Sequence, residues 1–156
     1  MYRQQADVML SAHFNQLIKP EVLQIPHLKC LNIHPSLLPK YKGVDPVFYA
    51  LLHREERTGV TVHFQEEKLD AGRILQQDSV PIEDNDSLLS LNIKLFTQGA
   101  VAAVSQIKRL TVDSVGTAQG DQQRGYDSWP ASDNVRVFQK ARKLLCWREL
   151  LKGLYN

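Results

Sequence analysis

The sequence predicts one α/β domain built around a mainly parallel sheet. Short apolar runs that are typical of strands alternate with helical patterns over the first 107 residues, as they do in that fold class. The length of 156 residues fits one domain with a short appendage. A hydrophobic content of 43% and a charged content of 23% are ordinary for a globular protein, so a mainly disordered chain is excluded.

Four apolar runs are expected to form strands. Residues 8–12 and 28–33 are apolar almost throughout, as buried strands are. Residues 58–65 alternate between apolar and polar side chains, which indicates a strand with one apolar and one polar face. Residues 74–80 follow an Asp-Ala-Gly turn and end at a proline, which predicts the fourth strand.

Four helices are expected between and after these strands. A short helix begins near Pro20, and Asp45 caps a second helix that runs from Pro46 to residue 52 or 53. An Asp or Ser cap opens a long helix over residues 88–107, with leucines spaced for a buried stripe. The last helix is predicted from about residue 134 to residue 151.

We divide the chain into a main portion, residues 1–110, and an extension, residues 111–156. The extension begins with a Gly-rich polar stretch and ends in the last predicted helix. Residues 134–156 carry six basic residues and one acidic residue. Such a helix usually presents a solvated face, and nothing here matches an RNA-binding motif, so nucleic acid is not an expected partner, although tRNA stays open.

The sequence predicts no membrane-spanning helix, no secretion signal and no metal site. It has no run of about 18 apolar residues, and its first residues lack the apolar stretch of a signal peptide, so a cytoplasmic protein is expected. Cys30 and Cys146 are too few for a disulfide framework and have no metal-ligand spacing, so no metal site is expected. Cys30 lies in an apolar run, which indicates a buried small hydrophobe rather than a reactive thiol.

The chemically informative residues follow the second strand. Asn32 and His34 are two residues apart at the end of an extended segment, so their side chains point to the same side. An amide donor beside a titratable imidazole suits acyl transfer, because the amide stabilises an oxyanion while the imidazole moves protons. Asp70 follows a later strand, and a carboxylate near His34 would stabilise the imidazolium. The alternatives are a hydrogen-bonded loop cap for the first pair and a plain turn for Asp70.

Three stretches of the main portion resemble the formyltransferase family, whose members act on glycinamide ribonucleotide, methionyl-tRNA and amino sugars. They are Asn-Ile-His-Pro-Ser-Leu-Leu-Pro-Lys-Tyr-Lys-Gly at 32–43, Thr-Gly-Val-Thr-Val-His-Phe at 58–64 and Leu-Asp-Ala-Gly-Arg-Ile at 69–74. The resemblance implies a Rossmann-like fold and transfer of a formyl group from 10-formyltetrahydrofolate to a small amine acceptor, without a metal. In that reading, Asn32 stabilises the oxyanion, His34 is the imidazole and Asp70 is the acid paired with it.

The resemblance also implies where the folate donor binds. The pterin slot corresponds to Phe14, Asn15, Gln16 and Leu17, although this segment departs from the family's usual small-residue and glycine pattern. The loop that closes over the pterin corresponds to Glu66, Glu67, Lys68 and Leu69. His63 either borders the site or is a plain sheet-edge histidine. In the extension, Tyr126 and Trp129 either stack on a ligand or pin the extension to the domain.

The family usually has about two βα units ahead of the first strand seen here, so the resemblance implies an N-terminally truncated domain. Truncation would leave one apolar face and one sheet edge bare, and self-association or a partner chain would cover them. The truncation also leaves two other functions open. The chain is either a formyltransferase, a formyltetrahydrofolate hydrolase in which water replaces the amine, or a non-catalytic binding or assembly module. The identity of the amine is not given by the sequence.

Overall fold

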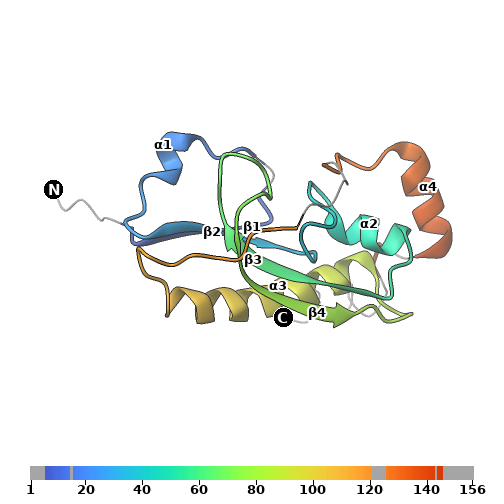
Figure 1. The fold of residues 1–156 in the computed structure, drawn as a ribbon. Coiled ribbons are helices and arrows are strands. Elements are labelled where there is room, and N and C mark those ends of the chain that lie inside the picture. Colours follow the sequence, from blue (N-terminus) through green and yellow to red (C-terminus); the bar gives the residue numbers. More distant parts are fainter. Residues whose placement is uncertain (1–5, 15, 121–125, 143, 146–156) are drawn as a thin grey trace, which may run out of the picture.

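A computed structural model describes residues 6–14, 16–120, 126–142 and 144–145 of the chain. Its centre is a four-stranded sheet of β1 (Val8–Ala12), β2 (Lys29–His34), β3 (Arg57–Phe64) and β4 (Ile74–Pro81), in the order β1-β2-β3-β4 (Figure 1). All four predicted strands are present within one or two residues of their expected ends. The α/β fold class is therefore confirmed.

The direction of the strands differs from the prediction. β1 and β2 are parallel, but β2 pairs with β3 and β3 with β4 in the antiparallel sense, so the expectation of a mainly parallel sheet was wrong. The reason is the connection after β2. Residues 35–56, with helix α2 (Pro46–Leu52) among them, return the chain at the end of the sheet where β2 leaves it, since His34 at the end of β2 pairs with Thr61 of β3. β3 therefore runs back beside β2 in the antiparallel sense.

Two helices begin at the residues that the sequence indicated. Asp45 caps α2, since its Oδ1 accepts the backbone N–H of Phe48 at 3.2 Å. Ser87 and Ser90 form a reciprocal capping box at the start of α3 (Leu88–Ile107).

Cys30 is buried as expected, with its Sγ donating to the Leu23 carbonyl at the end of the short helix α1 (Pro20–Leu23).

The last helix is shorter than predicted where the structure describes it. Helix α4 spans Ser132–Ala141, and Arg142 is already extended, with φ −139° and ψ 159°. The predicted part beyond residue 145, together with Cys146, lies outside the described residues. Phe138 of α4 is buried and stacks on Phe48 of α2, with ring centroids 4.7 Å apart. The extension is thus packed against the main portion, and the division at residue 110 stays a prediction.

In Figure 1, helix α3 runs along one face of the sheet and α1 lies on the other side, while α2 lies near the N-terminal end of α3 and shares its hydrophobic core. The approach of α3 to the sheet is close at Gly99, where a Cβ would lie 2.5 Å from Ile33 Cγ2 and 2.7 Å from Val60 Cγ2. By length and composition alone, α3 is the one described helix that could cross a membrane. The burial of Leu91 and Leu95 within the domain is equally typical of a core helix.

β1 lies at the end of the strand order and carries exposed apolar side chains. Within the described residues it pairs with β2 alone. Leu10 is 40% exposed, and near the strand Leu17 and Ile25 are 64% and 65% exposed. These side chains agree with the predicted bare face and edge. Self-association through this surface stays a prediction.

Candidate active site

Asn32 is held in a defined orientation by neighbours on both sides of β2. Ser11, its register partner on β1, donates from Oγ to Asn32 Oδ1 at 2.8 Å. On the other side, Asn32 Nδ2 lies 3.2 Å from Nε2 of His63, its register partner on β3. The amide group has two N–H donors, so this arrangement uses one and leaves the second for a ligand.

His63 is a buried neutral histidine with one assignable tautomer. Its Nδ1 lies 2.7 Å from the Phe64 carbonyl, which can only accept, so Nδ1 carries the proton and Nε2 accepts from Asn32. Burial lowers the pKa of His63 to about 4, helped by the nearby charge of His34. The sequence left His63 open between a site neighbour and a sheet-edge residue; its contact with Asn32 supports the first.

His34 and Asp70 meet at the carboxyl end of β2. His34 Nδ1 lies 3.4 Å from Asp70 Oδ1, and both side chains are buried. His34 Nε2 lies 2.9 Å from the Tyr41 carbonyl and therefore carries a proton. The Nδ1 edge of the ring therefore faces the Asp70 carboxylate, and the pair places an imidazole against an acid.

Backbone contacts fix Asp70 in an unusual conformation. Its φ is +48°, in the left-handed region that non-glycine residues rarely adopt. The Gly43 backbone N–H donates to Asp70 Oδ2 at 3.0 Å, and Gln119 of the extension donates to the Asp70 and Gly72 carbonyls at 2.9 and 2.8 Å. A strained backbone held by three contacts is common where a side chain must be aimed at a reacting group.

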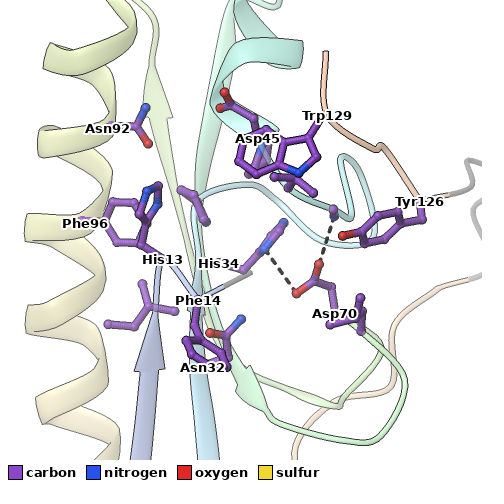
Figure 2. Close-up of a pocket in the computed structure, with 16 residues that line it drawn as sticks. His13, Phe14, Asn32, His34, Asp45, Asp70, Asn92, Phe96, Tyr126 and Trp129 are labelled. Atoms are coloured by element: carbon purple, nitrogen blue, oxygen red, sulfur yellow. Dashed lines mark hydrogen bonds and ion pairs between the residues drawn. The ribbon is translucent and has the colours of Figure 1, made fainter. Parts of the chain in front are cut away.

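Asn32, His34 and Asp70 line one pocket of about 260 Å³ (Figure 2). The three side chains come from positions 32 to 70 of the chain, and the tertiary structure brings them together as the family resemblance implied. The spatial arrangement is observed, while their catalytic roles stay predictions.

Of the residues predicted to bind the donor, two line this pocket. They are Phe14 and Leu69. Four others have exposed side chains that do not line it: Gln16, Glu66, Glu67 and Lys68. Leu17 lines a separate apolar groove along β1, and Asn15 lies outside the described residues. The assignment of these residues to donor binding stays a prediction.

Several pocket residues were not identified from the sequence. They are Asp45, Asn92 and Phe96; His13, which also lines the pocket, directly precedes the predicted pterin-slot residues. The sequence indicated Asp45 only as a helix cap, and Asn92 is next to a buried leucine of α3. A structural role therefore accounted for each residue, and nothing in the sequence indicated a place at the site. Tyr126 and Trp129, which the sequence left between stacking and pinning, lie at the pocket. Among the residues described, no group of three or more His, Cys, Asp or Glu side chains could hold a metal ion.

Comparison with known proteins shows which family this chain is similar to. The formyl transferase family model matches residues 1–107. The chain is 35% identical over 154 residues to the methionyl-tRNA formyltransferase of Halalkalibacterium halodurans and 33% identical over 150 residues to that of Bacillus licheniformis. In both cases the match covers 96% of this chain and 45% of the relative, so the chain spans about half the length of the curated relatives it matches.

Solved structures agree with the sequence relatives. An N-formyltransferase from Helicobacter canadensis, determined with folinic acid and dTDP-3-aminofucose, superposes with a TM-score of 0.64 at 29% identity, over 74% of this chain and 43% of that one. A sugar N-formyltransferase from Shewanella gives a TM-score of 0.63 at 23% identity, over 79% of this chain and 49% of that one, a likeness of fold alone. By its sequence over residues 1–107, its Rossmann-like α/β fold and its relatives, this chain belongs to the formyl transferase family.

Proposed function

We propose that this protein transfers a formyl group from 10-formyltetrahydrofolate to an amine. The observation that carries the proposal is the meeting of Asn32, His34 and Asp70 in one pocket, with His34 Nδ1 3.4 Å from Asp70 Oδ1. An amide donor, an imidazole and a carboxylate around one gap are the groups that acyl transfer to an amine requires.

The chain's own groups account for the charge and proton movements. The amine nitrogen forms a bond to the formyl carbon, the bond from that carbon to the folate nitrogen breaks, and one proton passes from the amine to the leaving folate nitrogen. Asn32 Nδ2 and the protonated His34 would stabilise the negative charge on the formyl oxygen. Asp70, directly or through water, would carry the proton, and its carboxylate faces the His34 ring.

The pocket is compatible with the reactive end of the donor. Phe14, Phe96 and Leu69 supply apolar surface for a flat ring, while Asn32 and Asn92 supply amide groups. The volume of about 260 Å³ is enough for that end rather than for a whole folate. Folate binding by relatives supports the same donor, since one solved neighbour holds folinic acid and another tetrahydrofolic acid.

For the acceptor, we propose only its chemical class, a small amine. The relatives' names point to methionyl-tRNA in one case and to amino-sugar nucleotides in another. Because the chain spans 45% of the first relatives, their substrates do not carry over directly. The cytoplasmic location likewise stays a prediction.

Radiolabelled donor separates the proposed reaction from its alternatives. The chain is incubated with 10-formyltetrahydrofolate labelled in the formyl group, with and without a panel of amines, and the label is followed into formamide and into free formate. If the chain transfers the formyl group, we expect the label in the formamide formed from the amine. Label in formate alone would indicate a hydrolase. No binding of 5-formyltetrahydrofolate in a calorimeter would indicate a non-catalytic module.

A further inference from the structure

Residues 126–129 of the extension form what we call the aromatic arm, and backbone contacts fix it beside the site. The Asp127 N–H donates to the Lys42 carbonyl at 2.7 Å, and the Val44 N–H donates to the Asp127 carbonyl at 3.0 Å. Tyr49 Oη donates to the Ser128 carbonyl at 2.8 Å. The contacts to Lys42 and Val44 lie on both sides of Gly43, whose N–H donates to Asp70. Residues 42–44 therefore hold both the arm and the Asp70 carboxylate.

The two aromatic side chains of the arm are not needed to hold it. Tyr126 is 48% exposed and Trp129 is 66% exposed, whereas Phe138 further along the extension is 1% exposed in the core. The bonds that fasten the arm come from its backbone. Exposed rings on a fixed backbone at the mouth of a pocket are typical of ligand contacts, because they offer apolar area at little cost in conformational entropy.

The rings lie across the site from the proposed donor side. In Figure 2, His34 and Asp70 are drawn between Phe14 and Asn32 on one side and Tyr126 and Trp129 on the other, and all six side chains line the same pocket. A donor bound against Phe14 leaves the arm's side open for the second substrate. The arm is therefore placed where an acceptor would approach the formyl carbon.

The charge of the pocket favours a cation. Asp45 and Asp70 both line it, and the imidazolium that the proposed function places at His34 offsets the charge of Asp70 alone; among the described lining residues there is no lysine or arginine. Lys42 is next to Gly43 but is not one of the lining residues. A phosphate or carboxylate near these two carboxylates would be repelled, whereas an ammonium group would be attracted both to them and to the aromatic faces.

Asp45 can also receive the proton that such a cation must lose. Burial raises the pKa of the Asp45 carboxyl above its usual range, although the Phe48 N–H and the neighbouring His13 act in the other direction. A raised pKa makes a carboxylate a better base for the ammonium proton. Only the neutral amine can then attack.

We infer that the aromatic arm is the acceptor-binding wall, and that it takes an ammonium group carried on an uncharged ring while rejecting acceptors whose ring also carries an anionic group. This inference rests on the proposed function and adds the chemical class of the acceptor. Trp129 would stack on the ring, Tyr126 would flank it, and Asp45 would face the amine.

Calorimetric titration of the full chain tests the inference. The protein is first saturated with 5-formyltetrahydrofolate, and that step tests the donor half of the proposed function separately. D-glucosamine and D-glucosamine 6-phosphate, which share the amine and the ring, are then titrated in parallel. The titrations are repeated with Trp129→Ala, Trp129→Phe and, as a control, Val137→Ala, an exposed residue of α4 that does not line the pocket.

The expected result is that glucosamine binds about tenfold or more tightly than its 6-phosphate, in keeping with charge repulsion and one lost cation contact. Trp129→Ala should weaken glucosamine binding about tenfold, Trp129→Phe about threefold or less, and Val137→Ala not at all. No binding of glucosamine, equal or tighter binding of the phosphate, or an unchanged Trp129→Ala variant would each overturn the inference. Unchanged binding of 5-formyltetrahydrofolate by every variant shows that the fold is intact.

Discussion

Nδ2 of Asn32 lies 3.2 Å from Nε2 of His63, and the other ring nitrogen of His63 lies 2.7 Å from the Phe64 carbonyl. The ring cannot turn over without giving up both contacts. With the Ser11 hydroxyl on its oxygen at 2.8 Å, the Asn32 amide is held in one of its two orientations, the one that presents N–H groups. His63 is thus a positioning residue, buried behind the group that is proposed to stabilise the oxyanion.

The first prediction compares two replacements of His63. His63→Leu removes the acceptor for the Asn32 N–H and should lower kcat about tenfold to a hundredfold, because the amide is no longer fixed. His63→Gln supplies an acceptor oxygen at a similar reach and should recover most of that loss. KM for 10-formyltetrahydrofolate should change little in both. Equal kcat for the two variants would show that His63 does not act through Asn32.

The second prediction concerns the charge on Asp70. Asp70→Asn keeps an acceptor for the Gly43 N–H but removes the charge facing His34, so kcat should fall by about two to four orders of magnitude while the melting temperature changes little. His34→Ala should also cost about two orders or more. Turnover is measured by label transfer from the donor. Asp78→Asn, at a half-buried position of β4 that does not line the pocket, is the control, and near-normal turnover in Asp70→Asn would remove its proposed role.

The third prediction follows from the pKa of His63, about 4 in the folded chain against 6.5 when unperturbed. Between these values the unfolded chain binds more protons than the folded one, so stability falls as the pH is lowered from about 6.5 to about 4, by up to about 3 kcal/mol. His34, Asp70 and Lys42 are the charged groups that act on it.

Urea unfolding at about pH 7 and about pH 4.5 measures this dependence. His63→Gln cannot take up the proton, so its free energy of unfolding should fall less over the same range than that of the original chain. Parallel pH profiles for the two proteins would contradict the assignment of a neutral His63.

The fourth prediction tests the support shared by the aromatic arm and Asp70. Gly43 has φ +130°, and a Cβ there would lie 2.0 Å from the Asp127 carbonyl oxygen. Gly43→Ala should therefore displace the arm, disturb the bond to Asp70 and cost about 1–3 kcal/mol of stability. Gly120→Ala, where the new Cβ meets nothing within 4 Å, is the matched control. Equal urea midpoints for the two variants would contradict this account.

The fifth prediction concerns the apolar surface beside β1. Leu17 and Ile25 are 64% and 65% exposed near an edge strand, so the chain should associate with itself at micromolar concentration. Light scattering after size exclusion gives the mass. Leu17→Asp should shift it towards the monomer, and Val137→Asp, on α4, should not. A stable monomer of the unchanged chain would count against self-association.

The sequence by itself determined the features that depend on neighbouring residues. The spacing of Asn32 and His34 places both on one side of β2, because side chains alternate along a strand. Asp45 before Pro46 and Ser87 before a leucine-rich run gave the starts of α2 and α3, because caps act within one helical turn. The motifs around Asn32, His34 and Asp70 also indicated the family, since they are long and correctly ordered.

Only the tertiary structure decided what depends on distant residues. The strand directions follow from the end of the sheet at which residues 35–56 return the chain, which the capping signals of α2 do not reveal. Asn32 and His63 are 31 positions apart and become partners through the antiparallel register of β2 and β3. The aromatic arm reaches Lys42 and Val44 from more than 80 positions away. Such contacts are made by the path of the whole chain, and local patterns of apolar and polar residues do not encode them.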